Sequence, residues 1–181
     1  MSYDRRINNN WSLFLDRDGV INRKISDGYV MSIHNFDFIP GAIEAINILS
    51  GRFKHIFIVT NQQCIGKGLI SIEEVYRIHL YMLEQIESAG GHITDIFIAP
   101  SLEKDKDPLR KPGTGMALEA VSKYPDTDLS KSVMAGDSVA DMLFGKKTGM
   151  INVLISPETM SDEKLFDYRY NNLLEFALSL D

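Results

Sequence analysis

The sequence contains a single cysteine, Cys64, among 181 residues. One thiol excludes an internal disulfide and a zinc site built from several thiolates. No apolar run approaches the roughly 18 residues that a membrane-spanning helix needs. The first ten residues are polar and lack the apolar segment of a signal peptide. These absences indicate a protein of a reducing compartment, so we expect it in the cytoplasm and away from membranes.

Positive charge is also scarce, with 19 Lys and Arg against 25 Asp and Glu. Surfaces that bind nucleic acid are usually basic, so we expect no nucleic-acid partner. Hydrophobic residues make up 44% of the chain, which suits a packed core and argues against disorder. No repeat, linker or insertion of the roughly 50 residues that a second domain needs is present. We therefore expect one domain over residues 1–181, a monomer, with residues 1–10 frayed.

Apolar segments of strand length alternate with amphipathic segments of helical spacing. We expect strands at residues 11–16, 55–59, 93–99, 132–135 and 151–155. Helices are expected at residues 42–49, 71–89, 116–124, in about ten residues around 140–144, and in the tail from 161 to 180. Residues 17–39 and 64–68 are expected as loops. The alternation predicts an α/β fold with a mostly parallel central sheet and helices on both faces.

Two aspartates, Asp16 and Asp18, follow the first expected strand and precede a glycine. Along an extended chain their side chains point to the same side, with Arg17 turned away. Two close carboxylates repel each other unless a proton or a cation neutralises them. Ligands bind at the carboxyl ends of strands in open parallel sheets. The stretch indicates a metal-dependent pair of acid and nucleophile; the alternative is an ordinary surface turn, because Asp and Gly are common turn residues.

Polar groups also follow the next three strands. They are Thr60 and Asn61, then Arg110 and Lys111, then Asp137. In a doubly wound sheet these strand ends lie along one edge and can converge. Phosphoryl transfer requires an in-line nucleophile, charge neutralisation and a proton for the leaving oxygen. This series of groups favours phosphate chemistry over independent surface turns.

The residue types suggest individual roles in that chemistry. Asp16 is the candidate nucleophile, because carboxylates form aspartyl-phosphate intermediates. Asp18 is the candidate acid and base, which protonates the leaving alcohol and later deprotonates water. We expect Mg²⁺ to be bound by the carboxylates of Asp16 and Asp137 and by the backbone carbonyl of Asp18, since Mg²⁺ prefers oxygen ligands. Thr60 and Lys111 would hold the phosphoryl oxygens.

These motifs, in order, resemble those of the haloacid dehalogenase-like (HAD) hydrolase superfamily. The resemblance is carried by 16–19, Thr60, Lys111 and 136–141, and it covers about residues 11–155. It implies a Rossmann-like three-layer α/β sandwich and assigns the same roles to Asp16, Asp18, Thr60, Lys111 and Asp137. Asp141 stays open between an outer partner of the metal site and a first-turn acid favoured by the helix dipole.

Within the superfamily, the chain is similar to the heptose-1,7-bisphosphate phosphatases and the related histidinol-phosphate phosphatases. The similarity is carried by residues 14–19, 28–30, 35–36, 60–62, 65–68 and 110–112. Both groups lack a cap domain, and none is expected here. The resemblance implies a small phosphorylated substrate, with heptose bisphosphate favoured over histidinol phosphate. Arg110 and the loop that begins at Asn61 would contact it.

The sequence departs from those relatives at two places. They carry a Cys/His zinc loop where residues 99–109 contain no thiol or imidazole, so no structural zinc is expected. Cys64 stands where they have glycine, and we interpret it as a small filler rather than a nucleophile. The four histidines show no ligand spacing, and packing or surface roles are favoured for them.

Two other functions use similar residues. A signalling receiver domain also places Asp, Thr and Lys at strand ends. Its phospho-accepting Asp lies on a middle strand, however, and it needs no second acid two residues after the first. A phosphatase for nucleic-acid ends is disfavoured by the acidic charge and by the lack of a basic, aromatic groove.

Overall fold

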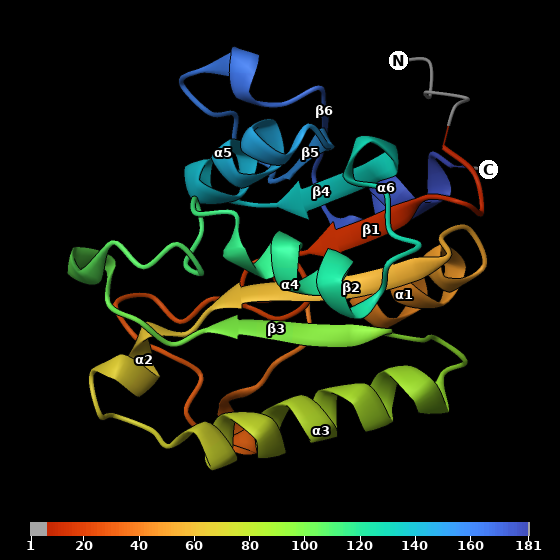
Figure 1. Ribbon diagram of the computed structural model, residues 1–181. Helices are drawn as coiled ribbons and strands as arrows, with labels where there is room; N and C mark the ends of the chain where they lie inside the picture. Colours follow the sequence, from red (N-terminus) through yellow and green to blue (C-terminus); the bar gives the residue numbers. More distant parts are fainter. Residues whose placement is uncertain (1–6, 181) are drawn as a thin grey trace.

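The protein is described by a computed structural model that covers residues 7–180. At its centre is a six-stranded sheet with the order β3-β2-β1-β4-β5-β6, in which all neighbouring strands are parallel. The strands are β1 (Ser12–Leu15), β2 (His55–Asn61), β3 (Asp95–Ala99), β4 (Ser132–Gly136), β5 (Ile151–Ile155) and β6 (Tyr168–Tyr170). β1 thus lies inside the sheet, between β2 and β4 (Figure 1).

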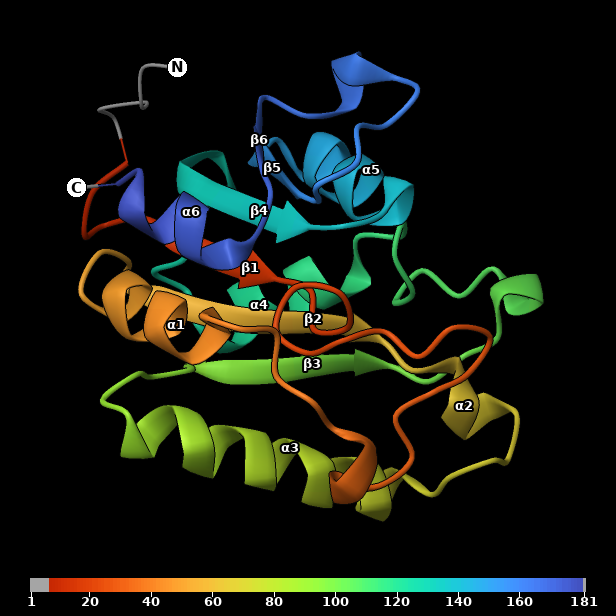
Figure 2. The same cartoon turned by 180° about the vertical axis from the view of Figure 1, so that it is seen from behind.

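Helices cover both faces of this sheet and make three layers. Helices α1 (Ala42–Ser50), α3 (Ile72–Ser88) and α6 (Leu173–Leu178) pack on one face (Figure 2). Helices α4 (Gly115–Lys123) and α5 (Val139–Thr148) pack on the other. One short helix, α2 (Gln63–Gly66), follows β2, and 3₁₀ turns lie at Ile33–Asn35, Glu103–Asp105, Leu129–Lys131 and Glu163–Leu165. The expected α/β sandwich with a parallel sheet is confirmed.

The side chains of β1 explain why two separate cores form. Leu13 and Leu15 point into the core beneath α1, α3 and α6, while Phe14 points into the core beneath α4 and α5. All three are fully buried. Phe14 packs on Phe57 with ring centroids 5.0 Å apart. Because the strand is apolar on both sides, it is held in the middle of the sheet, and Asp16 emerges at its carboxyl end.

The tail differs from the sequence-based expectation of one helix over residues 161–180. It forms a 3₁₀ turn, then strand β6, and only then helix α6. Without β6 the outer edge of β5 would be unpaired, and the aromatic alternation of Tyr168 and Tyr170 suits a strand that pairs with it. Asn172 then caps α6 by accepting a hydrogen bond from Glu175 N at 2.9 Å. Pairing with β5 thus outweighs the helical spacing of the apolar residues in this segment.

Two further expectations are modified. Residues 64–68 were expected as a loop, but Cys64 is fully buried within α2. Of the expected frayed terminus, residues 1–6 lie outside the described residues, while Ile7 packs into the larger core with 8% of its surface exposed. Within residues 7–180, no helix has the length and apolar character to cross a membrane.

Candidate active site

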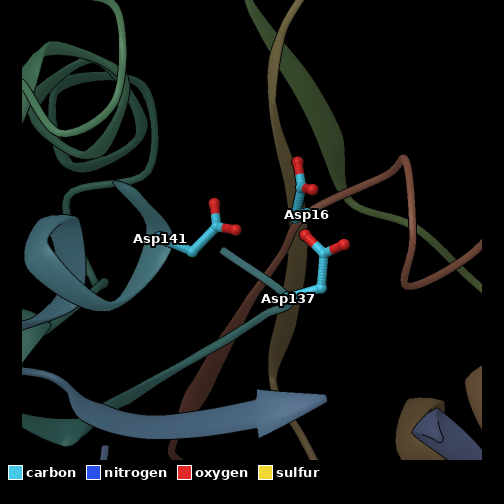
Figure 3. Close-up of side chains that lie close together, drawn as sticks. All are labelled: Asp16, Asp137 and Asp141. Carbon is cyan, nitrogen blue, oxygen red and sulfur yellow. The ribbon is translucent and has the colours of Figure 1, made fainter. Parts of the chain in front are cut away.

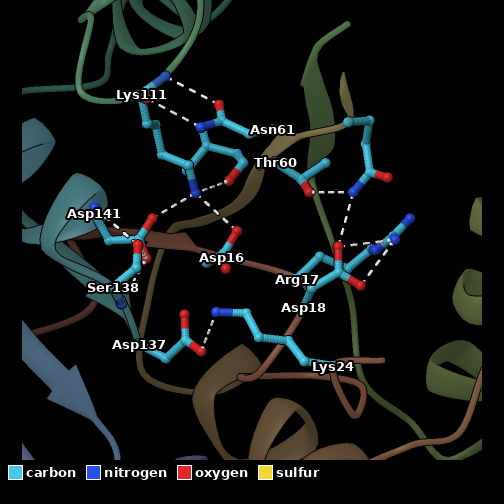
Figure 4. Close-up of polar contacts among 12 residues, drawn as sticks. Asp16, Arg17, Asp18, Lys24, Thr60, Asn61, Lys111, Asp137, Ser138 and Asp141 are labelled. Atoms are coloured by element: carbon cyan, nitrogen blue, oxygen red, sulfur yellow. Dashed lines mark hydrogen bonds and ion pairs between the residues drawn. The ribbon is translucent and has the colours of Figure 1, made fainter. Parts of the chain in front are cut away.

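The polar residues singled out in the sequence meet at the carboxyl edge of the sheet (Figure 4). Asp16 follows β1, Thr60 lies near the end of β2, and Asp137 follows β4. β1 lies between β2 and β4 in the sheet, so these three positions are neighbours in space. Lys111 reaches the same point from the segment between β3 and α4. The predicted convergence of strand ends is therefore present.

Three carboxylates form the centre of this site. One oxygen each of Asp16, Asp137 and Asp141 lies within 4.8 Å of the others (Figure 3). Asp16 and Asp141 are buried. Burial raises the pKa of Asp16 to about 7, against the opposing effect of Lys111. Burial also raises the pKa of Asp137, against Lys24. Ionised carboxylates this close are unfavourable unless a cation joins them.

The cluster fits a hard divalent cation. Asp137 Oδ1 is buried and has no hydrogen-bond partner among the described residues. A buried, unsatisfied carboxylate oxygen is costly unless a ligand completes it. Carboxylate oxygens are the donors that Mg²⁺ prefers in proteins. Asp16 and Asp137 are thus suited to the metal role that the sequence predicted for them, and Asp141 lies beside them.

Lys111 is a buried cation that joins this cluster to β2. Its ammonium donates to Asp16 Oδ1 at 2.8 Å and to the carbonyl oxygen of Val59 at 2.6 Å, and it pairs with Asp141 Oδ1 at 2.6 Å. The ammonium thus makes two hydrogen bonds and one ion pair, and all three partners are buried oxygens. Burial disfavours the charged form, but Asp141 and Asp16 outweigh it and raise the pKa of Lys111. A permanent positive charge thus lies against the predicted nucleophile.

Asp141 lies in the first turn of α5, which is one of the two interpretations left open by the sequence. Its Oδ2 accepts hydrogen bonds from Ser138 N at 3.0 Å and from Ser138 Oγ at 2.5 Å, while its own N–H donates to Ser138 Oγ. Asp141 and the N-cap residue Ser138 therefore form a capping box at the start of α5, in which Asp141 is the third residue of the helix. Its other oxygen faces Lys111. The same carboxylate thus ends the turn after β4 and orients the site's lysine.

Asn61 holds the segment that carries Lys111. Its Nδ2 donates to the carbonyl oxygen of Lys111 at 3.0 Å, and its Oδ1 accepts from the Lys111 N–H at 3.0 Å. Both ends of the side-chain amide are engaged by one backbone unit. We predicted that Asn61 contacts the substrate; the structure shows it at the rim of a pocket, fixing Lys111.

Asp18 is held apart from the other carboxylates by a dense set of donors. Arg17 Nη2 donates to both of its oxygens at 2.9 Å, and Asn22 Nδ2 and Gln62 Nε2 each donate at 2.8 Å. Burial disfavours the carboxylate form, but Arg17 and these hydrogen bonds outweigh it and hold the pKa of Asp18 below its ordinary value. The side chain thus has a fixed direction and, without substrate, a negative charge.

The expectation that Arg17 turns away from the aspartates is wrong. β1 ends at Leu15, and the carbonyl oxygen of Arg17 accepts turn hydrogen bonds from the N–H groups of Ile21 and Asn22 at 2.9 and 3.1 Å. The chain is therefore not extended from Asp16 to Asp18, and the alternation of a strand does not apply there. This turn lets the Arg17 guanidinium fold back onto Asp18.

Thr60 is almost fully buried near the end of β2. Its Oγ1 accepts a hydrogen bond from Gln62 Nε2 at 2.8 Å, and the same nitrogen donates to Asp18. Gln62 thus links the predicted phosphate-binding hydroxyl to the predicted acid. It received no role from the sequence, although its position two residues after Thr60 on the extension of β2 is the signal that points to it.

Comparison with known proteins supports the family resemblance noted in the sequence. A family model described as HAD-hydrolase-like matches residues 108–173. The D-glycero-alpha-D-manno-heptose-1,7-bisphosphate 7-phosphatase of Mycobacterium tuberculosis is 37% identical over 137 residues, which cover 76% of this chain and 72% of that protein. Its counterpart from Campylobacter jejuni is 33% identical over 164 residues, covering 91% and 92%. The chain belongs to the HAD-like hydrolases.

A solved structure extends the likeness of this HAD-like hydrolase to the whole fold. A D,D-heptose 1,7-bisphosphate phosphatase from B. bronchiseptica, crystallised with magnesium and phosphate, has a TM-score of 0.81 and 25% identity. The match covers 94% of this chain and 97% of that one. The expectation of a hydrolase from this superfamily is thus confirmed.

A glycine and a lysine shape the mouth of the site in this HAD-like hydrolase. Gly19 has a φ of +95°, and a Cβ there would lie 2.1 Å from Asp137 Oδ2. Only glycine lets the turn after Asp18 pass so close to the carboxylate. Lys24 forms an ion pair with the same oxygen of Asp137, and its side chain is about half exposed.

A pocket of about 420 Å³ opens beside Lys111. Its charged lining consists of Arg110, Lys106, Lys147 and Lys111, against two acids, Glu103 and Asp107. Arg110 Nη1 reaches the carbonyl oxygen of Ser101 at 3.4 Å, at the long end of hydrogen-bond distance. The excess of cations in the lining suits an anionic ligand next to the carboxylate cluster.

The segment that forms one wall of this pocket is organised by its own acidic residues. Asp105 Oδ2 accepts from Leu102 N at 3.1 Å, and Asp107 Oδ1 accepts from Leu109 N at 2.8 Å. The carbonyl oxygen of Pro100 accepts from the N–H of Gly66, which ties the segment to α2. Side-chain turns, together with backbone hydrogen bonds within the segment and to α2, thus shape residues 100–110.

Proposed function

We propose that the protein is an Mg²⁺-dependent phosphomonoesterase that removes the 7-phosphate of D-glycero-D-manno-heptose 1,7-bisphosphate through an aspartyl-phosphate intermediate. The observation that carries the chemistry is the buried contact of Lys111 with Asp16 and Asp141, beside Asp137. A permanent cation and a candidate metal site beside Asp16 support its role as the nucleophile. The substrate is favoured by the names of the relatives from M. tuberculosis and C. jejuni.

The metal would be held by Asp16, Asp137 and the backbone carbonyl of Asp18. The unpartnered Oδ1 of Asp137 and the raised pKa of Asp16 support this arrangement. When bound, Mg²⁺ supplies positive charge that offsets the carboxylates and the phosphoryl oxygens.

In the first step, an Asp16 carboxylate oxygen forms a bond to phosphorus, and the bond between phosphorus and the sugar oxygen breaks. Asp18 gives its proton to that leaving oxygen. Lys111 and Thr60 hold the phosphoryl oxygens in line. Asp16 is suited to the attack because its Oδ1 is already fixed by Lys111 at 2.8 Å.

In the second step, water attacks the phosphorus of the aspartyl-phosphate, Asp18 takes the water proton, and the Asp16 carboxylate is released with inorganic phosphate. The lowered pKa of Asp18 suits this base role. For the first step, Asp18 must gain a proton, and an anionic phosphate placed beside it favours that uptake. The same carboxyl thus alternates between acid and base.

The remaining proposals concern substrate and setting. Arg110 and the adjoining pocket would receive the part of the substrate beyond the reacting phosphate, including its second phosphate. We further propose one domain over residues 1–181, no structural zinc, a monomer and a cytoplasmic location. Neither nucleic acid nor a membrane is a proposed partner.

The test is phosphate release from a panel containing heptose 1,7-bisphosphate, histidinol phosphate and an aryl phosphate, with Mg²⁺ and with EDTA. The proposal requires the heptose bisphosphate to have the highest kcat/KM and EDTA to abolish turnover. Asp16→Asn should eliminate turnover while the circular-dichroism spectrum is unchanged, because Asn keeps the acceptor for Lys111. A preference for histidinol phosphate would overturn the substrate assignment. A long-lived phosphoprotein that forms without turnover would overturn the proposal that the protein is a phosphatase.

A further inference from the structure

Arg17 is a fully buried arginine at the side of the site, with 1% of its side chain exposed. Its Nη2 donates to both oxygens of Asp18 (Figure 4). Its Nε has no hydrogen-bond partner among the described residues. The Phe36 ring lies 6.0 Å from its Cζ. The direction of the guanidinium therefore depends strongly on what holds its remaining nitrogen, Nη1.

That nitrogen is held by a histidine from a distant helix. Arg17 Nη1 lies 2.9 Å from His79 Nε2, and both residues are buried. A guanidinium has only donors, so Nε2 must be the acceptor, with the ring neutral and its proton on Nδ1. Burial, with Arg17 acting in the same direction, lowers the pKa of His79 to about 3, which agrees with a neutral ring.

His79 is unusual among its neighbours on α3. The buried face of that helix otherwise consists of apolar residues: Val75, Ile78, Met82 and Ile86. A polar ring in such a face is unfavourable unless its polar atoms are paired. The contact with Arg17 supplies that pair and connects α3 to the turn after β1, 62 residues earlier in the sequence.

We propose that His79 is a positioning residue for the acid and base Asp18, acting through Arg17. This proposal rests on the proposed function, because it assumes that Asp18 protonates a leaving group. Asn22 and Gln62 also hold Asp18, but each offers it one donor, whereas Arg17 Nη2 contacts both oxygens. When the His79 acceptor is lost, Nη1 is no longer held. The guanidinium can then rotate, because Nε has no partner among the described residues, and the Asp18 carboxylate moves with it out of line with the leaving oxygen.

A packing role alone makes a different prediction. A misdirected acid slows only reactions whose leaving group needs a proton. The sugar oxygen of a heptose phosphate is a poor leaving group, whereas para-nitrophenolate leaves without protonation. kcat/KM includes only the steps up to and including the first irreversible one, which here forms the aspartyl-phosphate. The later hydrolysis of that intermediate is common to both substrates and therefore does not affect the comparison. Looser packing would instead lower kcat/KM equally for the sugar phosphate and for the aryl phosphate.

The experiment compares His79→Leu with wild type on heptose 1,7-bisphosphate and on para-nitrophenyl phosphate. For the sugar phosphate we expect kcat/KM to fall by about ten-fold or more, mainly through kcat, because small misplacements of catalytic groups have effects of this size. For the aryl phosphate the fall should stay under about three-fold. His79→Gln, which keeps an acceptor, should retain more of the sugar phosphatase activity than His79→Leu.

Met82→Ala is the matched control, since Met82 is fully buried on the same face of α3. It should lower the melting temperature while its effects on the two substrates stay equal. Equal losses on both substrates for His79→Leu, or identical behaviour of the Leu and Gln variants, would overturn the positioning role. If wild type hydrolyses no phosphomonoester, the proposed function itself fails, and that result is obtained before any variant is compared.

Discussion

Replacing Lys111 by methionine tests the charge balance of the buried site. Met keeps most of the volume of the side chain and removes only its ammonium. Lys111 contacts Asp16 at 2.8 Å and Asp141 at 2.6 Å, and 2% of its side chain is exposed. The variant therefore leaves two buried carboxylates without their shared cation. In EDTA, no divalent ion compensates for that loss.

The expected size of the effect follows from this burial. Breaking a buried ion pair by removing one partner costs about 3–5 kcal/mol. For a protein of this length, each kcal/mol shifts the melting temperature by about 2–4 °C, which gives a fall of about 6–20 °C. Lys131→Met is the control, because Lys131 is mostly exposed and pairs with Asp128 at 3.4 Å. An exposed pair contributes about 1 kcal/mol or less.

The assay is thermal unfolding followed by circular dichroism in EDTA near neutral pH. Combining Lys111→Met with Asp141→Asn should recover part of the lost stability, because one uncompensated charge disappears. Added Mg²⁺ should raise the melting temperature of Lys111→Met more than that of wild type. A fall no larger than that of Lys131→Met, with no gain in the double variant, would refute the view that Lys111 compensates the buried carboxylates.

Three further outcomes are expected. In EDTA, the urea midpoint of wild type should fall relative to that of Asp16→Asn as pH rises from about 4 to about 7, because the pKa of Asp16 is raised from 3.8 to about 7 in the folded state, which then holds a proton that the unfolded chain has lost; a difference between the two midpoints that moves in favour of wild type over this range would contradict it. Gly136→Ala should lower both stability, by about 1–3 kcal/mol in urea unfolding, and kcat, because its Cβ would lie 2.4 Å from the Cβ of Asp141. Arg110→Ala should raise KM for the heptose bisphosphate by about ten-fold or more with a smaller change in kcat, as measured by phosphate release, since charged hydrogen bonds to substrate contribute about 1.5–3 kcal/mol.

Local pattern was enough to predict the framework of the protein. The apolar runs before Asp16, Thr60 and Asp137 are buried strands because only a two-sided burial accommodates such runs. Alternation with helices then requires parallel strands and right-handed crossovers, so polar groups at the strand ends must share one edge. The order of the candidate site residues along the chain was therefore sufficient to predict that they meet.

Contacts between distant segments required the tertiary structure. The strand β6 formed where a helix was expected, because its partner β5 is specified by the fold and not by residues 168–170 themselves. Arg17 turns toward Asp18 because the chain leaves the strand one residue before Asp16. Hydrophobic periodicity predicts neither feature, because it indicates which residues are buried but not which segment they pack against.

Within the site, the sequence likewise predicted which residue types are present but not which contacts they make. The sequence by itself determined that three aspartates follow strands and that a lysine lies between the third strand and the next helix, because those positions follow from local pattern. Only the tertiary structure decided that Lys111 joins Asp16 to Asp141, that Asn61 holds the backbone of Lys111, and that His79 lies against Arg17. Hydrogen bonds depend on distances of a few tenths of an ångström between atoms, and such distances are set by the packing of the whole sheet.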